Sequence, residues 1–369
     1  MPNASTALLH ALLARGDYLE QFTQDQLRTL LPILERAHSD VLGRIVLRPE
    51  AGTKTEYDAW LAEEAANINE IYQAAAAKMA GRAMPELEKL AGDETDWING
   101  ESARIMAGVS FATPAAATLW ASITALPAAA GSTLGQLFEA LGVSAPADAI
   151  SAIQESMAAG ETVDQLTRRL RGEVVKRATW SKDADGVQRY HPGVYEGGAM
   201  TGSTRDAEML ARTAVMHVGN QAREAFYSQN SDVIKAVQYV ATLDLDTCLI
   251  CGSLDGEVYE GDEGRPELPL HPRCRCLYVP VMKSFRDLGI AMDQLPPSTR
   301  ASMDGQVPEF ETYADRLAKA SPSRRIEMLG PARAALYEKG VSLDSMVKDG
   351  AVVPLKDMRI SKEKAKGAA

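Results

Sequence analysis

All four cysteines of this 369-residue chain lie between residues 248 and 276. Cys248 and Cys251 are separated by two residues, and His271, Cys274 and Cys276 follow about twenty residues later. The first spacing lets both thiolates of a tight turn point at one ion. In an extended segment, residues at i and i+2 share a face, so Cys274 and Cys276 can face the same ion, whereas His271 and Cys274 need a turn. The pattern predicts a zinc site.

These five donors compete for four tetrahedral positions. A closed set of four protein ligands is typical of structural zinc, whereas catalytic zinc keeps a position for water. Because the sequence offers one donor too many, we expect a structural ion, about one per chain. Cys248, Cys251 and Cys274 are the first expected ligands, and Cys276 and His271 are alternatives for the fourth position.

Two disulfides, or four buried cysteines without a metal, are the alternatives to zinc. The start of the chain, Met1 to Thr6, lacks the basic residues and apolar run of a secretory signal, which predicts a reducing cytoplasm. Disulfides rarely persist in that compartment, and close clustering of all the cysteines is unlike long-range disulfide bonding. Both points favour the metal.

Other residues with chemical potential have ordinary explanations. Three arginines of one predicted helix, Arg205, Arg212 and Arg223, and two that flank the cysteines, Arg273 and Arg275, can form either a phosphate-contacting surface or ion pairs with acidic residues. The net charge of -11 favours ion pairs and argues against a chain that binds nucleic acid over its whole surface. His217 lies in a predicted helix with no obvious nucleophile beside it, so a structural role is favoured.

No sequence pattern indicates an enzyme. The chain has no Gly-x-Ser-x-Gly elbow and no glycine-rich phosphate loop that ends in Lys-Ser or Lys-Thr. We therefore expect no catalytic residues. The enzymatic alternative is a zinc-dependent nuclease in which His271 and Asp244 act beside the cysteines.

The elements that must position the cysteines are a long helix and a strand. Apolar residues at helical spacing predict a helix over residues 204–229, and β-branched and aromatic residues predict a strand over 236–243, directly before Cys248.

The composition of the whole chain favours helices over sheets. Only 6% of residues are aromatic, and alanine, leucine and glutamate recur in long stretches. We expect a mainly α protein with a small α+β zinc-knuckle module at about 204–283.

The N-terminal part, residues 1–104, is predicted to be an elongated helical region with helices over 18–46 and 56–90. Residues 105–138 contain no charged side chain, which calls for a membrane test. They are mostly Ala, Gly, Ser and Thr and are broken by Pro114 and Pro127, so a buried or protein-facing segment is favoured over a membrane helix. Any contact with a membrane would be made by this segment.

The rest of the chain is expected to be mostly helical. Helices are predicted over 146–159 and 163–171, and a loop or mobile arm over 174–203. Residues 139–285 form the predicted core region. Residues 286–369 form a C-terminal extension with helices over 311–320, 322–329 and 331–339, followed by a polar tail over 361–369.

A particular order of short motifs resembles the phage Mu F-like head morphogenesis family. The motifs are Thr242-Leu-Asp244, Thr247-Cys-Leu-Ile-Cys251, Leu254-Asp-Gly256, Leu270-His-Pro-Arg-Cys-Arg-Cys276 and Val279-Pro280. The preceding helix, with Ala211-Arg-Thr213 and Asn220-Gln-Ala222, is similar to the family's helix, but Ala214 stands where an acidic residue is usual. The resemblance covers about residues 139–285 and extends more loosely to Met328-Leu-Gly330 and Arg333-Ala-Ala-Leu336.

The resemblance implies a minor head protein of a tailed bacteriophage, with a structural role at the portal in head assembly and in DNA packaging or delivery. It implies a location in the virion after assembly in the host cytoplasm. The portal protein is the first expected partner, and the major capsid or scaffold protein and the packaged DNA are further ones. A virion-carried effector enzyme is the remaining alternative, but residues 286–369 are short for such a domain.

Overall fold

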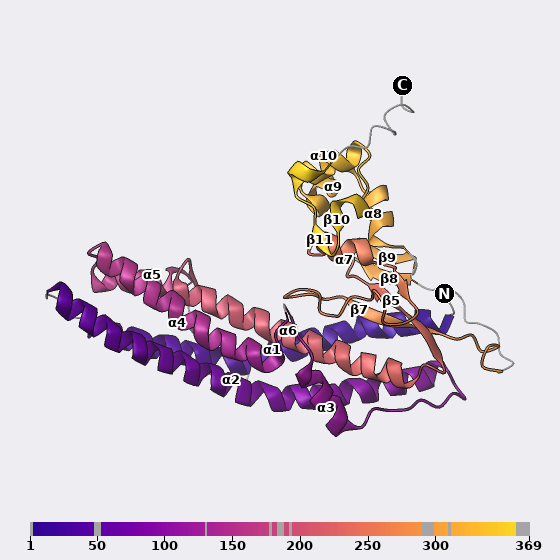
Figure 1. Ribbon diagram of the computed structural model, residues 1–369, viewed down its shortest axis with the longest axis horizontal. Coiled ribbons are helices and arrows are strands. Elements are labelled where there is room, and N and C mark those ends of the chain that lie inside the picture. Colours follow the sequence, from indigo (N-terminus) through magenta and orange to yellow (C-terminus); the bar gives the residue numbers. More distant parts are fainter. Residues whose placement is uncertain are drawn as a thin grey trace. The chain divides into compact units, whose positions relative to one another are not determined.

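The computed structural model describes residues 3–47, 53–129, 131–176, 179–182, 188–191, 194–289, 299–308 and 311–358. It confirms a mainly helical protein with long N-terminal helices and small sheets near the cysteines (Figure 1). The predicted polar tail at 361–369 lies outside the described residues. Among the described residues, no helix is both long enough and apolar enough to cross a membrane.

The helices are α1 (Asn3–Ile45), α2 (Lys54–Ile105), α3 (Ala116–Ala125), α4 (Leu134–Ala158), α5 (Val163–Arg171), α6 (Ala199–Gln229), α7 (Leu249–Leu254), α8 (Tyr313–Lys319), α9 (Pro322–Leu329) and α10 (Pro331–Glu338). The strands are β1 (Glu173–Lys176), β2 (Thr179–Lys182), β3 (Gln188–His191), β4 (Val194–Glu196), β5 (Ile234–Val240), β6 (Val258–Tyr259), β7 (Leu277–Met282), β8 (Thr299–Ser302), β9 (Gly305–Pro308), β10 (Val347–Lys348) and β11 (Ala351–Val352). Two short 3₁₀ helices, η1 (Asp344–Met346) and η2 (Leu355–Asp357), lie in the C-terminal part.

The chain folds into two compact units. The first contains residues 1–19, 91–123 and 216–369, and the second contains residues 20–90 and 124–215. Helices α1, α2 and α6 each contribute residues to both units. The cysteines and His271 all belong to the first unit.

The second unit is a helical bundle whose helices run side by side (Figure 1). Its buried residues recur every three or four positions along α1 and α2, as an amphipathic helix requires; they include Leu27, Leu30, Leu34, Val41, Ile68, Tyr72, Met79 and Leu87. Gly142 of α4 permits close packing, because a Cβ at that position would lie 3.1 Å from the Cβ of Ala76 on α2. Pro32 and Pro85 lie inside α1 and α2 without ending them, so tertiary packing outweighs the lost helical hydrogen bonds.

The first unit is built around a three-stranded antiparallel sheet in the order β6-β5-β7. The C-terminal half of α6 packs on this sheet, where the Tyr227 hydroxyl donates to the carbonyl oxygen of Tyr278 at 3.1 Å. The start of α1 reaches the sheet as well, because the backbone N–H of Met282 donates to Ser5 Oγ at 2.8 Å. Both contacts anchor β7, the strand that directly follows Cys276.

A separate small core holds the C-terminal elements α8, α9, α10 and η1. We refer to the described residues from 299 to 358 as the C-terminal module. The prediction of three helices here is confirmed, and Thr312 and Ser321 cap α8 and α9 with their side-chain oxygens. The core of the module also includes Leu243, which lies before the cysteine turn.

The prediction of a loop or mobile arm over 174–203 was wrong. Strand β1 pairs with β4 and strand β2 pairs with β3, so part of this stretch forms antiparallel ladders, and α6 already begins at Ala199. Gly172 and Gly198 allow the base of the ladders to close, because a Cβ at Gly172 would lie 2.4 Å from the carbonyl oxygen of Glu196. Glycine, proline and polar residues had indicated a loop over the whole stretch, because the strands between them are too short to show a clear alternation.

Helix α4 also differs from the prediction, because it runs through Pro146 without a break and begins within the uncharged segment. Its start is fixed by a capping box, in which the Thr133 side chain and the Gln136 side chain each bond the other's backbone N–H. The rest of the uncharged segment includes α3, of which only Leu119 and Ile123 are buried.

Candidate metal centre

Cys248 and Cys251 lie at the beginning of helix α7, directly after a tight turn that follows β5. Cys248 is the N-cap of α7, and its sulfur accepts the backbone N–H of Cys251 at 3.4 Å. The turn is held by Asp244, which accepts the Thr247 hydroxyl at 3.2 Å and the Asp246 N–H at 3.0 Å. The backbone of the turn therefore fixes both thiols on the same side of a short helix.

The second group of donors follows a turn that ends at β7. The backbone N–H of Cys274 donates to the carbonyl oxygen of His271 at 3.0 Å, and Arg273 between them adopts a left-handed conformation with φ of 63°. This is the turn that the spacing of His271 and Cys274 requires. Cys276 then leads into β7, and its carbonyl oxygen accepts the side-chain amide of Asn220 on α6 at 3.2 Å.

The structure brings the five predicted residues together. The Nε2 atom of His271 lies 3.2 Å from the sulfur of Cys248 and 3.3 Å from that of Cys251, and the sulfurs of Cys251 and Cys274 are 4.0 Å apart. Ligand atoms of a tetrahedral zinc site are separated by about 3.5 Å for sulfur and nitrogen and about 3.8 Å for two sulfurs, given the usual bond lengths. The spacing therefore fits a small tetrahedral cation.

Cys251 is shared between two groups of donor atoms. One group contains Cys248, Cys251 and His271, and the other contains Cys251, Cys274 and Cys276; within each group the atoms lie within 4.8 Å of one another. Cys251, Cys274 and Cys276 are buried, and all four cysteines are free thiols. The geometry supports a metal site but does not reduce the five donors to four.

The imidazole of His271 is oriented for ligation through Nε2. Its Nδ1 atom lies 2.9 Å from the carbonyl oxygen of Pro272, so Nδ1 must carry the proton and donate it. Without a metal, Nε2 donates to the Cys248 sulfur, and this hydrogen bond raises the pKa of His271 to about 9. Loss of that proton would free the Nε2 lone pair for a metal. Hydrogen bonding of the second ring nitrogen to a carbonyl is a common way to orient a metal-binding histidine.

The thiols shift one another's pKa values in opposite directions. The pKa of Cys248 is lowered to about 4, first by its hydrogen bond to the Cys251 thiol and then by His271, against the effect of burial. The pKa of Cys274 is also lowered, first by hydrogen bonds from Cys251 and Cys276. The pKa of Cys251 is raised, first by its hydrogen bonds to the Cys248 and Cys274 thiols. For Cys276, a hydrogen bond from Cys251 lowers the pKa, but the hydrogen bond to Cys274 and burial outweigh it, so that the pKa is raised overall. Four thiolates this close repel one another unless a cation lies between them.

A tyrosine completes the surroundings of the sulfurs. The hydroxyl of Tyr239 is buried, and it faces the sulfurs of Cys251 and Cys276. Burial, followed by the nearby sulfurs of Cys276, Cys251 and Cys274, raises its pKa. The phenol therefore stays protonated, and its O–H can serve only as a donor toward the sulfurs.

Asp244, the second residue of the nuclease alternative, is bound in an ion pair. Arg275 holds both oxygens of this carboxylate, at 2.6 Å and 2.8 Å. Burial raises the pKa of Asp244, but hydrogen bonds from Arg275 and Thr247 outweigh it, and the pKa is lowered overall. A carboxylate with a low pKa that already accepts four hydrogen bonds is a poor general base.

Other predicted arginines also have acidic partners. Arg212 pairs with Glu20 at 2.5 Å, and Arg223, which is only 2% exposed, lies 3.6 Å from buried Glu94. Arg205 is exposed and Arg273 occupies the turn described above. These pairs support the ion-pair interpretation over a phosphate-contacting surface.

Two histidines away from the cysteines, His217 and His38, form hydrogen bonds that have a structural and not a catalytic role. His217 is fully buried, and its Nε2 lies 3.1 Å from the carbonyl oxygen of Ile123, in agreement with the structural role favoured from the sequence. His38 contacts Ser203 at 3.0 Å, but the Ser203 hydroxyl donates to the carbonyl oxygen of Met200, so the imidazole must donate to serine. His38 therefore does not act as a base toward Ser203.

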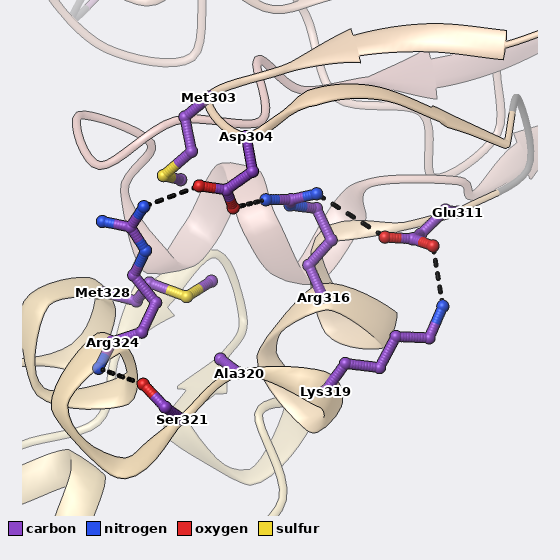
Figure 2. A pocket seen from close by; sticks show the side chains of 9 residues that line it. All are labelled: Met303, Asp304, Glu311, Arg316, Lys319, Ala320, Ser321, Arg324 and Met328. Carbon is purple, nitrogen blue, oxygen red and sulfur yellow. Dashed lines mark hydrogen bonds and ion pairs between the residues drawn. The ribbon is translucent and has the colours of Figure 1, made fainter.

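A hollow of about 290 Å³ lies in the C-terminal module, away from the cysteines (Figure 2). Its charged side chains alternate in sign: Asp304 pairs with Arg324 and Arg316, and Glu311 pairs with Arg316 and Lys319. Arg324 has a further acidic partner in Glu327. Because these charges compensate one another, the hollow is explained as an ion-pair network that joins α8, α9 and the β8–β9 hairpin.

Sequence reasoning missed a second buried network beside the cysteine turn, formed by Asp255 and Arg300. Their side chains are 0% and 4% exposed, and their closest atoms are 3.2 Å apart. Asp255 belongs to the Leu254-Asp-Gly256 motif, so a signal was present. Its partner could not be identified, because Arg300 lies 45 residues later in a segment without a distinctive pattern.

Comparison with known proteins gives one match. Residues 149–279 match a protein family described as Phage Mu protein F like protein, a segment that ends inside β7 and contains all five donor residues. No curated protein and no solved structure matches the chain.

Proposed function

We propose that the chain is a minor head protein of a tailed phage whose role is structural, because residues 149–279 match the Phage Mu protein F like protein family. In this proposal it binds the portal protein, contributes to head assembly, and is present in the virion after assembly in the host cytoplasm. Contacts with the major capsid or scaffold protein and with packaged DNA, and a part in DNA delivery, extend the same role.

The observation that carries the structural role is the closed set of donors. A zinc ion among Cys248, Cys251, Cys274 and one of His271 and Cys276 would have four protein ligands and no position for water. Such an ion joins the turn after β5 to the turn before β7. It would contribute roughly 10 kcal/mol or more to local folding, as in zinc-finger peptides.

Charge and pairing support protein contacts as the main role. The net charge of -11 opposes broad contact with DNA. Arg212, Arg223 and Arg275 have acidic partners and are not available as a phosphate-binding surface. A rigid metal centre whose arginines are already paired with acidic side chains is suited to contacts with other proteins of an assembly.

The proposal is tested by two measurements on the full chain. Metal analysis after removal of loosely bound ions should find about one zinc per chain. The zinc-loaded chain should then co-purify with portal rings from the same phage, and the Cys251→Ser variant should lose both the zinc and the portal contact. A chain that folds without metal and does not co-purify with portal rings would contradict the proposal. Cleavage of plasmid DNA by the pure chain would favour the nuclease alternative instead.

A further inference from the structure

We propose that metal binding at the cysteine turn and docking of the C-terminal module are coupled through helix α7. This inference rests on the metal centre proposed above and adds a partner for it within the chain. The module begins at Thr299, beyond the family segment that ends at residue 279.

Helix α7 contributes to two different cores. Cys251 belongs to the core that surrounds the three-stranded sheet, together with Cys274 and Cys276. Leu249, two residues earlier, packs against the core of the C-terminal module. The six residues of α7 are too few to form a stable helix alone. The position of α7 therefore depends on its packing against the sheet core and against the core of the C-terminal module.

Close packing at Gly252 joins α7 to the module. A Cβ at Gly252 would lie between 2.7 Å and 3.0 Å from three ring atoms of Tyr313, the first residue of α8. A Cβ at Gly256 would lie 2.7 Å from Cγ2 of Thr312. The ring of Tyr313 therefore lies directly against the α7 backbone, where only glycine leaves room for it.

A buried ion pair fastens the end of α7 to the module. Arg300 of β8 donates to both oxygens of Asp255, the C-cap residue of α7, at 3.2 Å and 3.3 Å. Asp255 also accepts the backbone N–H of Tyr313 at 2.8 Å and that of Ala241 at 2.9 Å. Displacement of either element would leave a buried charge unpaired, so α7 and the module must move together or separate completely.

These contacts make the two events thermodynamically linked. A metal that fixes Cys248 and Cys251 also fixes the backbone against which Tyr313 packs. By reciprocity, a docked module must strengthen metal binding by the same factor by which metal strengthens docking. Loss of the metal is therefore expected to release the C-terminal module while the helical second unit remains folded.

The first experiment compares hydrogen exchange in the zinc-loaded full chain and after chelation. Backbone amides of α8, α9 and α10 should lose protection when zinc is removed, whereas those of α2 and α4 in the second unit should not. Stoichiometric zinc with unchanged protection of α8 to α10 after its removal would overturn the coupling and leave the metal centre intact. A chain that never binds zinc would overturn both.

The second experiment measures zinc affinity by competition with a chromophoric chelator. Gly252→Ala, which drives a methyl group into Tyr313, and Arg300→Leu, which touches none of the donors, should each weaken zinc binding about tenfold. Gly261→Ala, between β6 and β7, is the matched control, because nothing lies within 4 Å of its Cβ position. Tyr313→Leu added to Gly252→Ala should recover part of the lost affinity. Equal affinities for Arg300→Leu, Gly252→Ala and the control would overturn the proposal.

Discussion

The Nε2 atom of His271 lies 3.3 Å from the sulfur of Cys251, although twenty residues separate the two in the chain. This contact closes the loop between β5 and β7, and Cys251 simultaneously approaches Cys274 on the returning segment. Cys251 is thus the donor common to both groups around the centre. Its removal should have larger consequences than removal of any other cysteine.

Cys251→Ser is expected to abolish tight zinc binding and to lower the thermal stability of the sheet region. Serine keeps nearly the same shape but is a poor zinc ligand, so the effect reports the lost thiolate. The matched comparison is a pair of variants, His271→Ala and Cys276→Ser. If zinc has four ligands, one of the two should retain about one zinc per chain and the other should lose it. Zinc content can be measured by mass spectrometry of the intact chain under native conditions.

Gly142→Ala is expected to leave the second unit about 1–3 kcal/mol less stable than a glycine-to-alanine change at an open helix position, because its methyl group would lie 3.1 Å from the Cβ of Ala76. Gly81→Ala on α2 is the matched control. Nothing lies within 4 Å of its Cβ position, so alanine should stabilise the helix by about 0.5–1 kcal/mol through its higher helix propensity. Urea unfolding followed by circular dichroism measures both changes. Equal effects of the two substitutions would show that α2 and α4 do not pack closely at Gly142.

The second unit should lose stability in mild acid because of His38. Burial, assisted by Arg171, lowers the pKa of His38 to about 4, from about 6.5 in the unfolded chain. Between these two values the unfolded state binds more protons, so stability is fully present above about pH 6.5 and falls as the pH drops toward 4. The loss attributable to this residue is about 3 kcal/mol at most.

His38→Gln removes that titration while keeping a side chain that can donate to Ser203. Its unfolding free energy should therefore change less between about pH 7 and about pH 5 than that of the native chain. Some dependence should remain, because burial also lowers the pKa of His217. An identical pH dependence of the two proteins would contradict the buried position of His38.

The fold and the site were predictable to different extents from the sequence. Helical periodicity identified most long helices, and the predicted ranges 163–171 and 322–329 match the observed bounds of α5 and α9. The β1–β4 ladders were missed, because their strands are short and interrupted by polar and glycine residues. How the chain divides into independently folding parts stays a prediction.

Clustering of the donors followed from spacing alone, because a turn at Cys248 and another at His271 leave few other arrangements. The buried residues that hold the two turns in place could not be predicted from spacing. The buried pair of Asp255 and Arg300 joins residues 45 positions apart, and although Asp255 belongs to a recognisable motif, no local pattern marks Arg300 as its partner. Long-range partners of this kind depend on tertiary packing, which periodicity does not encode.

The most direct test of the account is X-ray absorption at the zinc edge of the purified full chain. We predict a four-coordinate ion with three or four sulfur ligands at about 2.3 Å and at most one nitrogen ligand, with no oxygen. That result would establish a closed, structural centre. An oxygen ligand from water would instead indicate an open, catalytic site, and absence of bound zinc would contradict the metal centre itself.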